Sequence, residues 1–434
     1  MRSILAPAAM LLIAAAPAPS PTPPTADTRF DRIWQDEWAW REKEGIADHA
    51  PGTVEAHIAD DSAAAHARRL AYWRDVLTKL DAIDPKTLLP DTLTDWQVYR
   101  AQIASQVDDE TFREFEKPVN GDSAFWSDLQ GVARGNFANG ERDYRNYLSW
   151  LGDIPGFFAQ ETDNMKAGLA RGFTPPAVVM QGREKGVAEI AGATDPTKVS
   201  YYEPFTKLPA TMPAATQEAL RAAARKVIAD QVIPAHQRLL AFLQQSYFPG
   251  LTKQLGADKY PNGAAYYQSR IRVYTTTDLT PDAIHQLGLA EVAKIRAEME
   301  KAKADAGFKG DLPAFLTFIR TDPQFHPTTG DQLLKEAAWH AKRFDGMAAK
   351  WFGRLPRQRF AIIEVPPQIA PYYTSGRGGP GVYLVNTYDP QSRSLPQLPA
   401  LTLHESAPGH AFQMPLAAEN KALKPFRRNS YISA

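Results

Sequence analysis

The sequence predicts a mainly helical protein that carries one small β-hairpin or sheet edge near its C-terminal end. Between residues 28 and 351, apolar residues recur at helical spacing in long segments, which Pro and Gly residues separate. Only 360–365 and 381–387 combine β-branched and aromatic residues in the manner of strands. The sequence contains no repeat of fixed period and no sustained heptad, which excludes solenoid and coiled-coil architectures.

The predicted helices, in chain order, cover 30–44, 53–80, 93–107, 143–170, 216–248, 281–303 and 331–351. Two of them contain an internal proline, Pro155 and Pro234, which lacks an N–H donor and is expected to bend or interrupt the helix. Thr280 precedes Pro281, a favourable pair of N-cap and first helical residue. We divide the chain into a helical region, 28–260, and a catalytic-like region, 261–434.

The first residues predict export from the cytoplasm. Arg2 precedes an apolar run over 4–16, which is shorter than the about 20 residues that span a membrane. Ala16-Pro17-Ala18 fits an A-x-A cleavage site, so we assign 1–18 to a signal peptide and 19–27 to a Pro-rich linker. The alternative is a disordered Ala- and Pro-rich tail. The signal peptide predicts a periplasmic or secreted protein with no stable membrane insertion after cleavage.

The composition excludes several classes of function. Of the residues, 44% are hydrophobic and 23% are charged, and the formal net charge is zero. A protein without a basic surplus is a poor partner for nucleic acid, so we expect none. The absence of cysteine excludes disulfides, thiolate metal ligands, a cysteine nucleophile and a lipid anchor on cysteine.

The segment that carries chemistry is H-E-S-A-P-G-H, residues 404–410. Two histidines that flank a glutamate are typical of zinc hydrolases, in which the histidines bind Zn²⁺ and the glutamate acts on water. His410 lies six residues after His404, which on a straight helix turns it by about 240°, away from the shared face. Pro408 and Gly409 predict a break that returns His410 toward His404. Glu405 is then the candidate general base. The alternative is a capped, kinked structural helix.

Residues 404–413, H-E-S-A-P-G-H-A-F-Q, resemble the H-E-x-x-P-G-H-x-x-Q signature of the domain-of-unknown-function 885 (DUF885) family, bacterial proteins grouped with zincin-like metallopeptidases. The resemblance continues upstream through 371–373, 376–387 and 398–400, and through 274–281 and 284–289. It implies a large helical, zincin-like metallopeptidase that is secreted and depends on zinc. It also implies a third zinc ligand, a glutamate in an E-G-W-A-L-Y-like segment after the motif. The sequence stops at Ala434 before such a segment, so we expect a C-terminally truncated chain.

Two other residues are weaker candidates for the metal site. Glu419 is the nearest downstream carboxylate and a candidate substitute ligand, although it lies nine residues after His410 and can equally face solvent. His285 lies in one of the segments that carry the resemblance, and we favour a structural role for it.

Residues around the predicted strands are candidates for substrate binding. In zincins a sheet edge commonly lies beside the motif helix, and an extended peptide can add to it as a further strand. Tyr372, Tyr373, Tyr383 and Asn386 are therefore candidates for the substrate cleft, and the alternative is a packed hairpin. The Gly-rich segment 375–381 lacks the G-K-[ST] ending of a phosphate-binding loop, which favours a flexible lip over the cleft.

The sequence thus predicts a zinc-dependent peptidase-like protein that hydrolyses peptide bonds with a metal-activated water, inactive or a fragment as written. Its partners are a peptide or a small amide substrate. The alternative is a catalytically disabled, secreted helical protein that binds peptides. A hydrolase for a non-peptide amide is a third reading, because the same zinc chemistry serves it.

Overall fold

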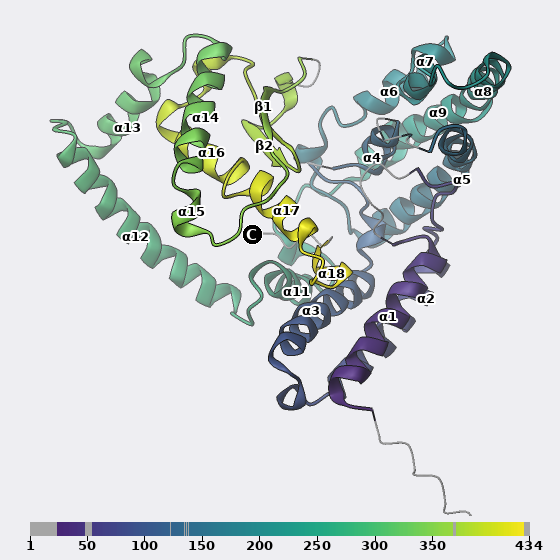
Figure 1. Ribbon diagram of the computed structural model, residues 1–434, viewed down its shortest axis with the longest axis horizontal. Helices are drawn as coiled ribbons and strands as arrows, with labels where there is room; N and C mark the ends of the chain where they lie inside the picture. Colours follow the sequence, from purple (N-terminus) through teal and green to yellow (C-terminus); the bar gives the residue numbers. More distant parts are fainter. Residues whose placement is uncertain are drawn as a thin grey trace, which may run out of the picture.

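The computed structural model describes residues 24–47, 54–121, 123–133, 135, 137, 139–367 and 370–428. It confirms a mainly helical fold with a small sheet. Figure 1 shows the helices between residues 26 and 242, labelled α1–α9, on one side of the molecule, and the helices between residues 281 and 419, labelled α12–α17, with the sheet on the other. The predicted signal peptide, 1–18, and most of the predicted linker lie outside the described residues. None of the described helices is long and apolar enough to cross a membrane.

The first three helices pack around an aromatic core. They are α1 (Ala26–Glu44), α2 (Ala63–Asp81) and α3 (Pro90–Phe112). Phe30, Trp73 and Tyr99 are buried in their core. Glu37 is also fully buried, and its carboxylate accepts hydrogen bonds from Trp73 Nε1 at 2.8 Å and from the hydroxyl of Tyr99. A buried carboxylate needs such donors, because desolvation without them is costly.

A second and larger core lies among the next helices. Its main elements are α4 (Phe125–Val132), α5 (Glu141–Arg171), α6 (Lys185–Ala191), α8 (Ala214–Val227) and α9 (Ile233–Phe242). Pro155 lies inside α5 but does not interrupt it, because α5 is one continuous helix. The predicted interruption near Pro234 is confirmed, because a π-helical turn, Ile228–Val232, separates α8 from α9. Two short helices, α7 (Glu203–Thr206) and α10 (Phe248–Gly250), complete this region.

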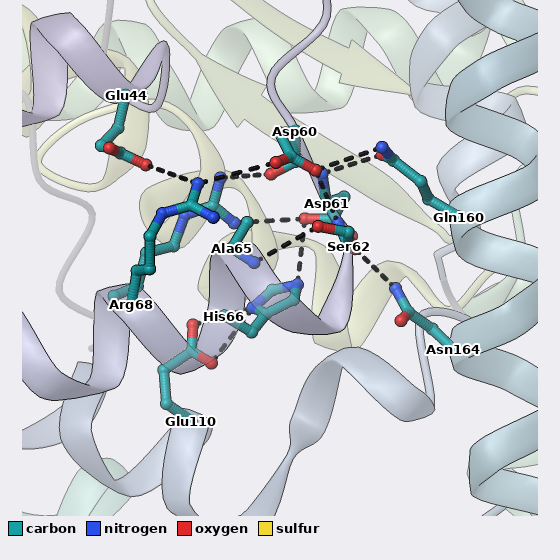
Figure 2. Close-up of polar contacts among 11 residues, drawn as sticks. Glu44, Asp60, Asp61, Ser62, Ala65, His66, Arg68, Glu110, Gln160 and Asn164 are labelled. Atoms are coloured by element: carbon teal, nitrogen blue, oxygen red, sulfur yellow. Dashed lines mark hydrogen bonds and ion pairs between the residues drawn. The ribbon is translucent and has the colours of Figure 1, made fainter.

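A buried polar cluster joins α2, α3 and α5 (Figure 2). The imidazole of His66 lies between two carboxylates, with Nδ1 3.0 Å from Glu110 and Nε2 3.2 Å from Asp61. Its ring stacks on Phe115. Asn164 on α5 donates a hydrogen bond of 2.8 Å to the backbone carbonyl of Asp61. The cluster therefore ties the segment before α2 to the two neighbouring helices.

The charges of this cluster are coupled. Burial lowers the pKa of His66, but hydrogen bonds and attraction to Asp61 and Glu110 outweigh it and raise the pKa to about 9. Burial raises the pKa of Glu161 on α5 to about 9, and the nearby Asp61 carboxylate adds to this shift. At neutral pH the cluster therefore contains a charged His66 imidazolium and an uncharged Glu161 carboxyl group.

The remaining helices are α11 (Gly263–Thr275), α12 (Pro281–Asp305), α13 (Leu312–Thr321), α14 (Gly330–Asp345), α15 (Ala348–Trp351), α16 (Leu398–Glu405), α17 (His410–Glu419) and α18 (Pro425–Arg428). Among them, α14, α16 and α17 pack against the sheet. The predicted helix 331–351 is thus two helices. The helix α12 has no buried residue, although it contacts the neighbouring helix α13.

The sheet has three strands in the order β1-β3-β2. They are β1 (Ala361–Glu364), β2 (Gly376–Gly379) and β3 (Val382–Val385). The strands β1 and β3 are parallel, and β2 pairs antiparallel with β3, with Gly378 opposite Tyr383. Both predicted strands are present. The prediction of a flexible lip over 375–381 is wrong, because most of that segment is the edge strand β2.

The end of the described chain returns to its beginning. Phe426 on α18 is 1% exposed and packs among Phe30, Trp34 and Tyr99. Lys424 pairs with Asp31 at 2.7 Å. Figure 1 shows α18 beside α3, so this short helix attaches the motif-bearing end of the chain to the first core.

Candidate metal centre

The motif residues lie at a break between two helices. The helix α16 ends at Glu405 and α17 begins at His410, as the Pro-Gly pair in the sequence predicts. Ser406 and Ala407 within the break are buried, and the Ala407–Pro408 peptide bond is cis. The N–H of Gly409 donates a hydrogen bond of 3.0 Å to the carbonyl of Leu403. The backbone groups of the break are therefore partly satisfied by α16 itself.

The break brings His404, Glu405 and His410 together. The two imidazole rings have centroids 4.8 Å apart and lie nearly perpendicular, at 86°. One ligand atom from each of the three residues lies within 4.8 Å of the others. His410 Nε2 is 3.9 Å from Glu405 Oε2. Within the described parts of the chain, these three residues form the one group of this kind.

The three side chains differ in exposure. His404 is exposed and His410 is partly buried, whereas Glu405 is 9% exposed. A carboxylate at this depth needs a donor, and the backbone N–H of Gly378 supplies one, 2.6 Å from Glu405 Oε2. The edge strand β2 therefore fixes the orientation of the Glu405 carboxylate. This contact was not predicted from the sequence, although the alternation of Gly376 and Gly378 before a strand is a signal for close approach.

Two glycines make the site possible by their small size. A Cβ atom at Gly409 would overlap the carbonyl of His404, and a Cβ atom at Gly378 would overlap the carbonyl of Glu405. The same atom at Gly378 would lie 2.9 Å from Cβ of His410. Gly409, which together with Pro408 predicts the break, also allows the backbone to pass very close to the carbonyl of His404 at the end of α16.

Two of the predicted substrate-binding residues are in the interior. Tyr383 on β3 is fully buried beside Leu333 and Leu398, and burial raises its pKa to about 12. Asn386 is fully buried, and its Nδ2 donates to the carbonyls of Ala370, Tyr373 and Thr374. Both residues therefore hold the sheet and the preceding loop in place, and in this structure neither faces a cleft.

The other two candidates lie in that loop. The backbone of Tyr372 is in a short 3-10 turn, Ala370–Tyr372, and its side chain is outside the described part of the structure. Tyr373 is partly exposed, and the guanidinium of Arg377 lies over its ring at 5.9 Å. Tyr373 thus stays a candidate for substrate contact.

The two weaker metal candidates lie elsewhere. Both oxygens of Glu419 accept hydrogen bonds of 2.9 Å from the backbone N–H of Arg357, and one also accepts from Gln358. These bonds lower the pKa of Glu419 and direct its carboxylate to the segment before β1. His285 is exposed on α12. Neither residue belongs to the group around His404.

The model of one protein family, DUF885, matches residues 40–434. The chain belongs to this family. Its description is "bacterial protein of unknown function", so the DUF885 match assigns no activity. No curated protein sequence matches the chain.

Two solved structures share the fold of this DUF885 chain. A "putative lipoprotein" from Colwellia psychrerythraea is similar with a TM-score of 0.79 and 18% identity, over 94% of this chain and 75% of that chain. A "putative lipoprotein of unknown function" from Shewanella oneidensis is similar with a TM-score of 0.57 and 15% identity, over 94% of this chain and 74% of that chain. At these identities the likeness shows the fold alone.

Proposed function

We propose that this protein is a zinc-dependent peptidase that acts outside the cytoplasm on peptide or small amide substrates. The observation that carries the proposal is the convergence of His404, Glu405 and His410 at a helix break. A structural kink would not require two imidazoles and a carboxylate to meet. The predicted signal peptide supports the location.

The donor set fits zinc. Zn²⁺ prefers imidazole nitrogen and carboxylate oxygen, and His404 and His410 offer two nitrogens at short range. In the proposal these two histidines supply two of the zinc ligands, and the described residues offer no third ligand outside the group of His404, Glu405 and His410. Zinc, when bound, supplies a Lewis acid that polarises a carbonyl and makes water more acidic.

Glu405 is suited to proton transfer. Its carboxylate is adjacent to the histidines and is oriented by Gly378, so one oxygen is held while the other can face water. In the proposal Glu405 accepts a proton from the attacking water and returns it to the leaving amine. Because β2 is an edge strand, an extended peptide can pair with its outward-facing backbone groups other than the Gly378 N–H, which is bonded to Glu405.

Metal content and peptide hydrolysis test the proposal together. We expect about one zinc per wild-type chain, and loss of zinc in His404→Ala and His410→Ala. The matched control is His285→Ala, because His285 is exposed on α12. Glu405→Gln is expected to keep zinc and to lower the hydrolysis rate about 10²–10⁴-fold.

Two results would contradict this function. Wild-type zinc content in His410→Ala would show that His410 does not bind zinc and would exclude the proposed metal site. Zinc-free protein that binds peptides without cleaving them would instead support the peptide-binding alternative.

A further inference from the structure

A small cavity lies close to the proposed site and has its own chemistry. It measures about 150 Å³, and its wall includes Arg393, Ser375, Ser394 and Gln397 over an apolar floor with Leu398 and Leu401. Arg393 is the single charged residue among those that line it. We call it the Arg393 cavity.

The guanidinium of Arg393 is held in place but is not neutralised. Its two terminal nitrogens donate to Ser375 Oγ at 3.3 Å and to the carbonyl of Tyr388 at 3.2 Å. Its Nε is buried and has no hydrogen-bond partner among the described residues. In that part of the chain no carboxylate lies within 4.0 Å of the guanidinium. A fixed cation without a counter-ion beside hydroxyl and amide groups favours an anionic ligand, above all a carboxylate.

Two elements connect the Arg393 cavity to Glu405. On α16, Leu401 precedes Glu405 by one helical turn, so both lie on one face about 6 Å apart along the axis. Ser375 directly precedes β2 and lies three residues, or about 10 Å, before Gly378, which binds Glu405. An extended peptide covers such a distance with about three residues.

We propose that the Arg393 cavity binds the C-terminal carboxylate of a peptide substrate, with an aliphatic side chain on the apolar floor. This inference rests on the proposed function and specifies its substrate class: short peptides with a free C-terminus, cut about three residues before it. Arg393 selects the substrate and takes no part in proton transfer.

The test separates binding from catalysis. N-acetyl-Ala-Leu and its C-terminal amide are titrated by calorimetry into protein freed of metal with chelator, so that no activity is needed. We expect the acid to bind about 10–100-fold more tightly than the amide. Arg393→Gln should abolish this preference, and Arg393→Lys should keep part of it. The matched control is Arg296→Gln, an equal charge change on the exposed helix α12.

Arg393 also donates hydrogen bonds to its neighbours, so its replacement can destabilise the fold. A second variant therefore leaves Arg393 in place. Ser394→Phe adds a ring to the cavity wall, retains the bonds of Arg393, and should weaken binding of the acid while the melting temperature stays near wild type. Equal affinity for acid and amide in wild type, or a preference that persists in Arg393→Gln, would overturn the inference. A carboxylate preference in a protein that hydrolyses nothing would support this inference and contradict the proposed function.

Discussion

Gly378 and Glu405 are joined by a hydrogen bond from the strand backbone to the carboxylate, at 2.6 Å. The bond connects the edge of the sheet to the last residue of α16. The contact is so close that position 378 has no space for a side chain. The position of the candidate general base is therefore set by a residue 27 positions earlier in the chain.

Gly378→Ala is expected to separate β2 from α16, because the new methyl group would overlap the carbonyl of Glu405. We expect a loss of about 1–3 kcal/mol in the free energy of unfolding, together with weaker zinc binding. Denaturant unfolding and metal titration measure both. Gly379→Ala is the matched control, because a Cβ atom there meets nothing within 4 Å. Equal loss in both variants would refute the steric argument.

Stability is expected to fall as the pH rises from 6.5 to 9. His66 and Glu161 both have a pKa of about 9 in the folded protein, above the values of 6.5 and 4.5 for the free groups. The folded state therefore binds more protons than the unfolded state in this window, and its stability declines by on the order of 1 kcal/mol per pH unit for each proton.

Urea unfolding at several pH values checks this dependence. Glu161→Gln keeps the shape of the uncharged group and should reduce the slope. An unchanged slope of stability against pH in that variant would exclude Glu161 as a source of the pH dependence.

Phe426→Ala is expected to cost about 3–5 kcal/mol, because Phe426 fills the aromatic core between α1 and α3. Amide hydrogen exchange should also become faster in α17, which α18 follows directly. Thermal unfolding and exchange mass spectrometry measure the two effects. Phe426→Leu, which keeps most of the volume, should fall between wild type and Phe426→Ala. Wild-type stability in Phe426→Ala would show that α18 does not hold this core together.

Asn386→Ala is expected to destabilise the loop before β2, since three carbonyl groups lose their shared donor. The expected loss is about 1–3 kcal/mol, the cost of unsatisfied buried polar groups. Limited proteolysis at 370–375 and chemical unfolding check it. A substrate-binding role would appear differently, as a raised KM with unchanged stability.

The helical character, both Val- and Ile-containing strands and the helix break at the motif follow from the sequence, because periodicity, β-branching and the Pro-Gly pair act locally. The strand β2 could not be predicted in this way. Glycine disfavours strands, but α16 approaches β2 so closely at Gly378 that this position has no space for a side chain. Likewise, the alternation of residues around Tyr383 predicts a strand, but it does not predict which face of that strand other elements cover. The partner of Glu405 is a backbone N–H group, and the glycines at 376 and 378 are a signal for close approach but do not identify that partner.

Because α18 packs on the first helices, the core of these helices is expected to be completed only after α18 has been synthesised. Gln102 Nε2 donates to the carbonyl of Phe426 across 324 residues of sequence. During synthesis from the N-terminus, Phe426 is therefore made long after Phe30 and Tyr99. Until then it does not cover the aromatic surface around these two residues. Loop closure over such a length is slow, and exposed apolar surface invites association meanwhile. The nascent protein is thus expected to depend on chaperones until residue 426 has left the ribosome.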